Sequence, residues 1–201
     1  AKPSTTVEQH LFALGMGNIP TYRYSHHLNH AAAAYFAMRQ NIEDPHLVLT
    51  LDGGGDGDCS HVYKAQNGKL ELLAKSDQSH SLGNIYACTT HLLGMKPHEH
   101  EYKVMGLAAY ANPEYSSDIL DIMHSYLGLD PHNNLCFKRK VPEPTAYIEP
   151  RLYRDLRPKR FDNISNGLQL FTEQLLVEWV KAAVKETGIK KVVVAGGVFM
   201  N

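Results

Sequence analysis

The spacing of apolar residues changes along this chain and separates helical segments from strands. Residues 25–36, SHHLNHAAAAYF, hold a run of alanine, the strongest helix former. Residues 47–51 are a short apolar run, and residues 59–65 and 70–74 are two further strand candidates. The Asn67-Gly68 pair between the last two is typical of a type I′ hairpin turn. The pattern predicts a helix followed by a three-stranded antiparallel meander.

Helical spacing returns in the middle of the chain. Residues 81–94 place their leucines and isoleucine at helical intervals and end on Gly94, a suitable C-cap. Residues 101–111 and 116–128 are predicted to continue as helices or helical turns, and Gly128 is expected to end the second.

The last third begins with a break in the pattern. Prolines among charged residues predict an irregular surface segment over residues 130–162, with a solvated basic cluster at residues 138–140. Apolar residues over 168–184 then predict an amphipathic helix that ends at Gly188. The strand after it, KKVVVAGG, is apolar enough to be buried on both faces.

Composition narrows the classes of protein that this chain can represent. The formal net charge of −1 gives no basic excess for phosphate contacts with nucleic acid. No apolar run reaches the roughly 18 residues that would span a membrane. Three widely spaced cysteines favour a reduced, cytoplasmic setting with buried thiols. The 12 histidines are the one compositional oddity.

Two of these histidines have the spacing of a metal site. His26 and His30 are four residues apart, so a helix projects them from the same face. The zinc-peptidase signature needs a glutamate after the first histidine as general base, and His27 stands there instead. The alternative is that these are ordinary polar residues at a helix start, with one imidazole in the core. The spacing alone leaves both interpretations open.

A glycine- and aspartate-rich turn follows the first strand, in LDGGGDGD. Glycines let backbone N–H groups approach phosphate oxygens closely. Carboxylates repel phosphate unless a divalent cation or its bound water lies between them. The alternative is a plain acidic turn, or a calcium loop that lacks the terminal glutamate. The residues concerned are Asp52, Gly53, Gly54, Gly55, Asp56 and Asp58.

A second glycine turn, Gly196-Gly197, ends the last predicted strand in VVVAGGVFMN. Alone it is an ordinary turn. Together with the first turn, also at the end of an apolar strand, it predicts an α/β fold of the actin-like class. In that fold a phosphate hairpin and an adenosine-side Gly-Gly turn face one cleft, and helices flank a mixed sheet.

Five segments in order, HHLNHAAAAYF, LDGGGDGD, SLGNIYACTTHLLG, EYKVMGLAAYA and VVVAGGVFMN, resemble carbamoyltransferases of the NodU type, which include antibiotic carbamoyltransferases. The resemblance covers residues 20–201. It implies an actin-like (ASKHA) domain similar to Kae1, the tRNA threonylcarbamoyl-adenosine protein. In such enzymes carbamoyl-adenylate is made from carbamoyl phosphate and ATP in a YrdC-like domain. The Kae1-like domain then transfers the carbamoyl group to a hydroxyl of a small-molecule or sugar acceptor.

The resemblance also implies roles for individual residues. His26 and His30 would hold iron or another divalent metal, with an aspartate beyond Asn201 as third ligand. Lys103 would meet a phosphate or substrate oxygen, with an exposed ion pair as the alternative, and Glu101 would also lie in the cleft. On chemical grounds Asp58 could take the acceptor proton, and the sequence leaves metal or phosphate contact open for it as well. The residues implied to bind the nucleotide are Asp52, Gly53, Gly54, Gly55, Asp56, Gly196, Gly197 and Asn201.

The family pattern extends beyond this chain at both ends. Residues 1–201 are expected to be part of one Kae1-like domain, without its first strands, its remainder and the YrdC-like domain. The chain alone is therefore not expected to transfer carbamoyl groups. Mg²⁺ could accompany ATP. The sequence leaves the oligomeric state open, and a homodimer is compatible with it.

Two other functions are compatible with parts of the sequence. An actin-like kinase or ATPase would use the same fold, but Mg²⁺ prefers oxygen ligands and gives no role to paired imidazoles. A non-catalytic nucleotide- or metal-binding module would need only the two turns or the histidine pair.

Overall fold

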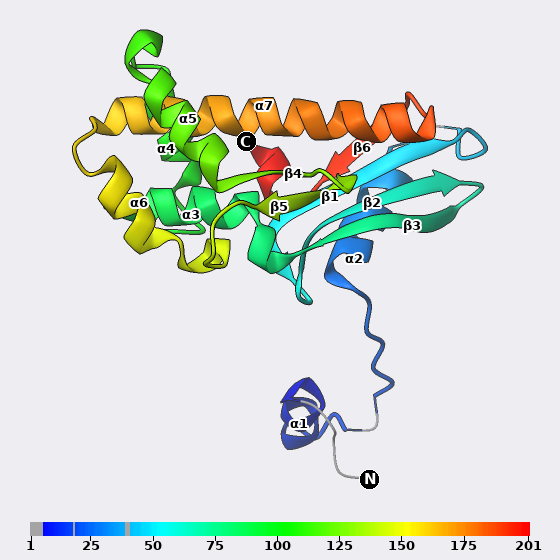
Figure 1. The fold of residues 1–201 in the computed structure, drawn as a ribbon. Coiled ribbons are helices and arrows are strands. Elements are labelled where there is room, and N and C mark those ends of the chain that lie inside the picture. The colour runs from blue at the N-terminus through cyan, green and yellow to red at the C-terminus, as the bar shows by residue number, and fades with distance from the viewer. Residues whose placement is uncertain (1–5, 18, 39–40) are drawn as a thin grey trace.

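The computed structural model describes residues 6–17, 19–38 and 41–201 as an α/β structure, from which α1 lies apart (Figure 1). Its elements, in chain order, are α1 (Thr6–Ala13), α2 (His26–Ala37), β1 (His46–Gly55), β2 (Asp58–Gln66), β3 (Lys69–Asp77), η1 (Gln78–His80), α3 (Leu82–Leu92), α4 (Glu101–Ala108), η2 (Pro113–Tyr115), α5 (Ser117–Tyr126), β4 (Leu127–Asp130), β5 (Asn133–Arg139), η3 (Thr145–Tyr147), α6 (Glu149–Leu156), α7 (Phe161–Thr187), β6 (Val192–Ala195) and η4 (Gly197–Met200).

The main sheet is mixed, with strand order β3-β2-β1-β6. β1, β2 and β3 form the predicted antiparallel meander. Asn67 and Gly68 both have positive φ, 51° and 73°, as a type I′ turn requires. β6 pairs parallel with β1 after the chain has passed through α3 to α7. The predicted mixed α/β class and the meander are confirmed.

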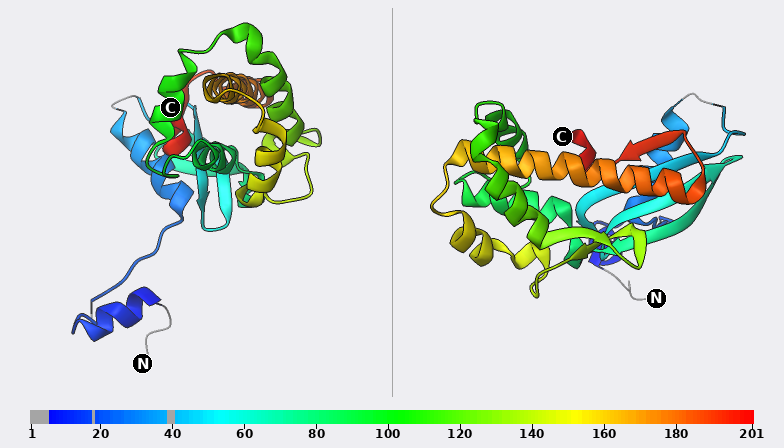
Figure 2. Two further views of the ribbon diagram at one scale, coloured as in Figure 1. Left: turned by 90° about the vertical axis from the view of Figure 1, so that its left-hand side faces the viewer. Right: turned by 45° about the horizontal axis from the view of Figure 1, so that its top comes forward.

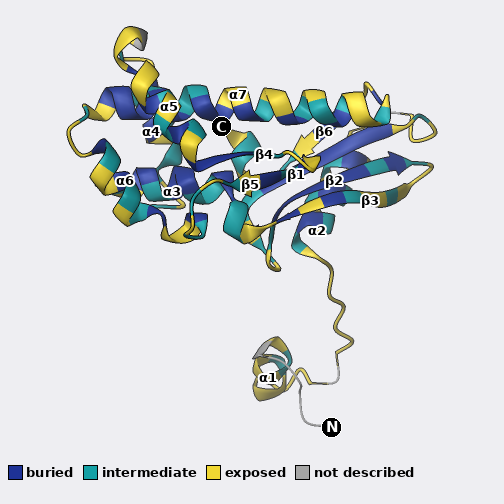
Figure 3. Ribbon diagram, in the orientation of Figure 1, coloured by how far each residue is buried: buried dark blue, intermediate teal, exposed yellow. Residues whose placement is uncertain are grey.

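Both faces of β1 are covered by helices. Leu47, Leu49 and Leu51 belong to the main core, which also contains side chains of α3, α5 and α7. Val48 faces the other way and joins a smaller cluster with Ala31 of α2. α2 and α7 therefore lie on opposite sides of the sheet (Figures 1 and 2). Figure 3 shows the first part of β1 as buried, whereas residues 52–55 at its end are partly exposed.

The core beneath α7 is centred on Trp179. This side chain is 0% exposed, lies 4.8 Å from the Phe137 ring between centroids, and donates a 2.8 Å hydrogen bond from Nε1 to the Leu135 carbonyl. We expect Trp179→Ala to lower the free energy of unfolding by about 3–5 kcal/mol, because it leaves a cavity and an unpaired carbonyl. Urea unfolding of the wild type and the variant measures this difference in the free energy of unfolding.

Glu178→Ala is the matched control for this variant, since Glu178 is exposed on the same helix. It should change the unfolding free energy by less than about 0.5 kcal/mol. A Trp179→Ala loss no larger than that of the control would show that the α7 core is wrongly described.

The segment 130–162 is not irregular, and that prediction is wrong. β4 and β5 form a two-stranded antiparallel sheet, and α6 follows. Leu135 and Phe137 alternate inward from β5, and Leu152 is fully buried on α6. Pro150 lies in the first turn of α6, where a missing N–H breaks no helical hydrogen bond. The prolines therefore mark the ends of short elements.

The basic cluster at residues 138–140 is also not wholly solvated. Arg139 is partly buried, because its Nη1 donates to the Ser79 hydroxyl over 2.8 Å and its Nε donates to the Val141 carbonyl. Lys138 is exposed, as predicted. The prediction fails at Arg139 because η1 lies beside β5, a contact that residue order does not reveal.

The predicted helix and strand at the end of the sequence are present as α7 and β6. The strand is less buried than predicted. α7 ends at Gly188, whose φ of 70° allows its N–H to reach the Val184 carbonyl. In β6, Val193 is 3% exposed but Val194 is 43% exposed. The prediction of burial on both faces is therefore wrong for the described chain. β6 is an edge strand among the described residues, since only β1 pairs with it.

Candidate metal centre and adjoining pockets

His27 anchors the first turn of α2 to the sheet. Its ring is fully buried and stacks on His61 with 4.5 Å between centroids. A carbonyl only accepts, so Nε2–H donates to the Asp58 carbonyl over 3.1 Å and Nδ1 accepts from the Thr50 hydroxyl over 2.9 Å. Burial lowers the pKa of His27, which keeps the ring neutral for this pairing. The rotation of α2 is fixed by these bonds.

The turn after β1 supports the same helix end. Asp56 accepts a hydrogen bond from the His26 backbone N–H over 2.7 Å, which satisfies a free donor at the helix start. A Cβ on Gly55 would overlap the His26 ring and come within 2.8 Å of the His26 Cβ. Gly55 therefore makes room for the imidazole, and the turn and the helix fit together only because that residue lacks a side chain.

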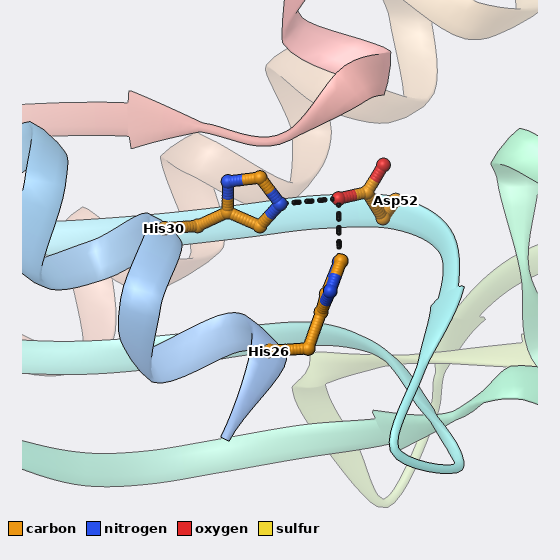
Figure 4. A group of neighbouring side chains, drawn as sticks. All are labelled: His26, His30 and Asp52. Carbon is orange, nitrogen blue, oxygen red and sulfur yellow. Dashed lines mark hydrogen bonds and ion pairs between the residues drawn. The ribbon is translucent and has the colours of Figure 1, made fainter. Parts of the chain in front are cut away.

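Three side chains meet at the C-terminal part of β1 (Figure 4). Nε2 of His26 lies 3.1 Å from Oδ2 of Asp52, and Nε2 of His30 lies 2.8 Å from the same oxygen. The two imidazoles stand nearly perpendicular, with centroids 4.7 Å apart. All three side chains are partly exposed. As predicted, His26 and His30 lie on the same face of α2, and both side chains point toward the Asp52 carboxylate.

This donor set suits a transition metal. The three ligand atoms lie within 4.8 Å of one another. Two imidazole nitrogens and one carboxylate oxygen are typical ligands of Fe²⁺ and related divalent ions, and they leave coordination positions open for substrate. Mg²⁺ prefers oxygen ligands alone. The partial exposure provides an entry path.

Asp52 is a candidate metal ligand that the sequence analysis did not predict. The expected third ligand lay outside the chain, with Asp52 at the phosphates. The structure supplies Asp52 as a candidate ligand within the chain, because β1 passes beside the first turns of α2. The aspartate beyond Asn201 stays a prediction. Its other oxygen, Oδ1, accepts a hydrogen bond from the Gly197 backbone N–H over 3.0 Å. Asp52 thus joins the histidine pair to the Gly-Gly turn.

The Gly196-Gly197 turn packs closely against β1. Gly196 has a φ of 104°, and a Cβ there would overlap the Leu51 carbonyl group. A Cβ on Gly197 would lie 2.7 Å from Oδ1 of Asp52. Both positions therefore require glycine for packing against β1 and Asp52, in addition to any approach to a ligand.

A pocket of about 390 Å³ adjoins Asp52 on the side of α3, α4 and η4. We call it the aromatic pocket because tyrosine and methionine side chains form much of its wall. Its lining residues are Asp52, Gly53, Gly83, Tyr86, Ala87, His98, Glu101, Tyr102, Met105, Gly197, Val198, Met200 and Asn201.

A second hollow of about 580 Å³ adjoins Asp52 on the side of η1 and η3. We call it the polar groove because amide, hydroxyl and carboxylate side chains dominate its wall. Its lining residues are Asp52, Gly53, Gly54, Gly57, Asp77, Gln78, Ser79, Asn84, His98, Pro144, Ala146 and Tyr147. Asp52, Gly53 and His98 line both hollows, so the two meet beside the candidate metal centre.

Residues 16–201 match the family model described as the carbamoyltransferase N-terminus. The chain belongs to the carbamoyltransferase family. The nodulation protein NolNO of Sinorhizobium fredii is 33% identical over 177 residues, which cover 88% of this chain and 25% of NolNO. The nodulation protein NolO of Bradyrhizobium diazoefficiens is 29% identical over 177 residues, which cover 88% of this chain and 31% of NolO.

A relative from an archaeon shows the same partial overlap. An uncharacterized protein of Methanocaldococcus jannaschii is 30% identical over 191 residues, which cover 89% of this chain and 34% of that protein. The carbamoyltransferase domain described here therefore spans about a quarter to a third of the length of these relatives. Among the described residues, no helix is both long and apolar enough to cross a membrane.

Several predicted site residues of this carbamoyltransferase domain line the two hollows. Glu101, Gly197 and Asn201 line the aromatic pocket, Gly53 lines both hollows, and Gly54 lines the polar groove. They come from β1, α4 and the chain end, so tertiary structure brings them together.

Other predicted residues are not brought to either hollow. Lys103 is exposed, and its Nζ lies 5.8 Å from the centroid of the Tyr102 ring. Gly55 and Asp56 support His26, and Gly196 packs on β1. Gly55, Asp56 and Gly196 therefore support the frame of the site, whereas Lys103 makes no hydrogen bond or ion pair with another predicted site residue among the described residues.

Asp58 lies in a separate network on β2. Its Oδ2 accepts from Nε2–H of His61 over 2.9 Å and from Nζ of Lys75 over 3.1 Å. Nδ1 of His61 accepts from the Tyr63 hydroxyl over 2.7 Å. Burial raises the pKa of that hydroxyl to about 12. The structure does not bring Asp58 to the metal cluster, although its backbone carbonyl holds His27.

Sequence reasoning missed residues that hold the end of β1 from the α3 side. The Ser81 hydroxyl donates to the Asp52 carbonyl over 3.1 Å and accepts from the Asn84 backbone N–H over 3.1 Å. A Cβ on Gly83 would lie 2.8 Å from the Gly53 nitrogen. A serine three residues before an asparagine at a helix start is a visible N-cap signal, but its contact with Asp52 is not.

Proposed function

We propose that this chain is the metal-binding and nucleotide-facing part of an O-carbamoyltransferase. The reaction would transfer a carbamoyl group from carbamoyl-adenylate to a hydroxyl of a small-molecule or sugar acceptor. The observation that carries the proposal is the convergence of His26, His30 and Asp52 beside the aromatic pocket, in a chain of the carbamoyltransferase family.

The aromatic pocket is the proposed site of the nucleotide half of the donor. Tyr102 is 63% exposed and offers a ring on which a base can stack, and Glu101 offers a carboxylate for ribose hydroxyls. Gly197 and Asn201 close the pocket at the chain end. The mixed sheet, with its parallel β1–β6 pair ending at this pocket, supports an actin-like, Kae1-like domain.

The transfer step can be written with its atoms balanced. The acceptor oxygen bonds to the carbamoyl carbon, the bond from that carbon to the adenylate phosphate oxygen breaks, and AMP leaves with the electron pair. The acceptor proton passes to water. A bound divalent ion, iron or another transition metal, would supply Lewis-acid stabilisation of the oxyanion.

The residues of this chain prepare the site for that step. His26 and His30 present their Nε2 atoms toward Asp52, held by the packing of α2 on β1. Asp52 is fixed on both sides, by the Gly197 N–H at Oδ1 and by the Ser81 hydroxyl at its carbonyl. Such preorganisation lowers the reorganisation that the transition state requires.

The proposal includes the substrates and setting of the full-length protein. Carbamoyl phosphate and ATP, with Mg²⁺ accompanying ATP, would form carbamoyl-adenylate in a separate YrdC-like domain. Cys59, Cys88 and Cys136 are all free thiols, which supports a reducing, cytoplasmic compartment. The chain alone is proposed to be inactive.

The products of ATP turnover test this function. Purified full-length protein, given carbamoyl phosphate and ATP, is expected to exchange pyrophosphate into ATP and to form AMP when a hydroxyl acceptor is present. Adenylate chemistry cleaves ATP between the α- and β-phosphates, so ADP should not accumulate. Separation of nucleotides by chromatography measures this.

Two alternatives give different products in the same assay. An actin-like kinase or ATPase would form ADP without any need for carbamoyl phosphate. A non-catalytic binding module would form neither ADP nor AMP. Accumulation of ADP, or bound nucleotide without turnover and without exchange, would overturn the proposed transferase.

A further inference from the structure

Helix α7 lies behind the aromatic pocket and contacts two parts of its wall. Gln169 and Glu173 are four residues apart, so they lie on one face of this helix. The pocket wall includes Tyr86 on α3 and Asn201 at the end of the chain. Figures 1 and 2 show the end of the chain beside α7. A polar side chain on this face of α7 can therefore reach both wall residues.

The Gln169 carboxamide joins these two residues. Its Oε1 accepts a hydrogen bond from the Tyr86 hydroxyl over 3.1 Å, and its Nε2 donates to Oδ1 of Asn201 over 2.9 Å. Nε2 also donates to Oε1 of Glu173 over 2.9 Å. Tyr86 and Asn201 come from distant parts of the chain, so a single side chain of α7 holds the α3 wall and the chain end together.

The chemistry of the partners fixes the direction of each bond. A carboxylate only accepts, so the Gln169 group that faces Glu173 is the NH2 group. The other side of the carboxamide is then its oxygen, which accepts, so Tyr86 is the donor there. The Asn201 atom that faces the Gln169 NH2 group is likewise an oxygen. Glu173 thus orients Gln169, and Gln169 orients Asn201.

Tyr86 completes the group. It is 4% exposed, and burial raises its pKa to about 12, so the hydroxyl keeps the proton that it donates to Gln169. A hydrogen bond from Asn201 opposes this rise in pKa. The Asn201 NH2 group is therefore the donor to the tyrosine oxygen, as expected when its own oxygen faces Gln169. Tyr86, Gln169 and Asn201 form a closed ring of hydrogen bonds.

We propose that Gln169 is a positioning residue for the proposed nucleotide pocket, because it fixes the carboxamide that Asn201 presents to the adenosine part of the ligand. The inference rests on the proposed function and concerns a residue behind the wall. Asn201 is exposed, so without these bonds its side chain would have to be ordered when the ligand binds. Gln169 removes that cost in advance.

Two substitutions separate hydrogen bonding from packing at this position. Gln169→Met keeps a side chain of similar length and removes all of the bonds. Gln169→Glu keeps the acceptor for Tyr86, but it cannot donate to Asn201 and places a second carboxylate four residues from Glu173. Both variants should therefore release Asn201.

The test measures binding of adenosine to the full-length protein by saturation-transfer NMR titration. Adenosine has the base and the ribose without a phosphate, so it probes this wall of the pocket. Tyr102→Ala should abolish the signal, which assigns it to the aromatic pocket. Gln169→Met and Gln169→Glu should each raise the Kd for adenosine by about tenfold, since a preorganised hydrogen bond is lost.

A double-mutant cycle shows whether Gln169 acts through Asn201. Asn201→Ala should raise the Kd by about tenfold, and Gln169→Met combined with it should raise the Kd no further. A residue that only stabilises the fold would give additive losses. Gln174→Met is the matched control, because Gln174 is exposed on the same helix and contacts His124. It should leave the Kd unchanged.

The contrary results distinguish this role from the proposed function. An unchanged Kd in both Gln169 variants, additive losses in the cycle, or an equal loss in Gln174→Met would overturn the positioning role and leave the proposed transferase standing. Adenosine binding that is absent, or that persists in Tyr102→Ala, would overturn the nucleotide pocket and the positioning role with it. Formation of AMP or ADP from ATP reports on the transferase separately.

Discussion

Replacement of His30 by alanine in the full-length protein is expected to remove bound metal and to abolish carbamoyl transfer. His30 Nε2 makes the shorter of the two contacts with Oδ2 of Asp52, 2.8 Å, so its loss opens the three-ligand cluster. The expected loss of metal affinity exceeds the roughly 10–100-fold typical of losing an outer-shell partner. His26→Ala should have the same effect. Elemental analysis of the purified protein measures metal content.

His132→Ala is the control for these variants, because His132 is exposed and lies outside the cluster. It should retain metal and transfer. Pyrophosphate exchange should survive in the His30→Ala protein, since adenylate formation is proposed to occur in another domain. Full metal content in both the His26→Ala and His30→Ala proteins would refute the ligand assignment and leave the pair as ordinary histidines at a helix start.

A single methyl group at Gly55 is expected to disrupt the same centre without touching a ligand. The Cβ of Gly55→Ala would occupy the space of the His26 ring, so the imidazole must turn away from Asp52. We expect metal affinity to fall by at least about tenfold, because catalytic and coordination geometry tolerates displacements of only about 1 Å. Isothermal titration of the metal-free protein with Fe²⁺ or Zn²⁺ measures the change.

Gly106→Ala is the matched control, since a Cβ at that position meets nothing within 4 Å. It lies on α4, where alanine favours helix, so it should leave metal affinity unchanged and stability equal or slightly higher. If the Gly55→Ala protein bound metal as tightly as the Gly106→Ala protein, the close packing of α2 on the β1 turn would be wrong.

The contrast between these variants separates ligands from supports. His30 contacts the place where an ion would lie, whereas Gly55 acts only through the position of His26. Substitution of a supporting residue should weaken metal affinity and leave the number of bound ions per chain at saturation unchanged. Substitution of a ligand should lower that number at any practical metal concentration.

Local chemistry in the sequence was enough to predict the main elements near the site. The alanine run predicted α2, the Asn67-Gly68 pair predicted the β2–β3 turn, and Gly188 predicted the end of α7. These signals act over a few residues, through backbone preference or hydrogen bonding, so neighbouring sequence contains the information. The spacing of His26 and His30 predicted a shared face for the same reason.

Long-range packing produced the errors. The segment 130–162 has short elements whose prolines stand at their ends, and its burial depends on α7 covering β5. Val194 is 43% exposed on β6, the edge strand of the described sheet, where its face of the sheet is not fully covered. In each case the deciding neighbour is distant in sequence, and apolar content alone does not identify it.

The sequence by itself determined the helix with the histidine pair, the glycine-rich turn after β1 and the resemblance to carbamoyltransferases, because each is written in contiguous residues. Only the tertiary structure decided that Asp52 meets both histidines, that Asp58 turns to His61 and Lys75, and that two chemically different hollows share the Asp52 wall. The reason is that the ends of β1, α3 and β6 converge through sheet pairing and helix packing, and those contacts join residues as far apart as Asp52 and Gly197.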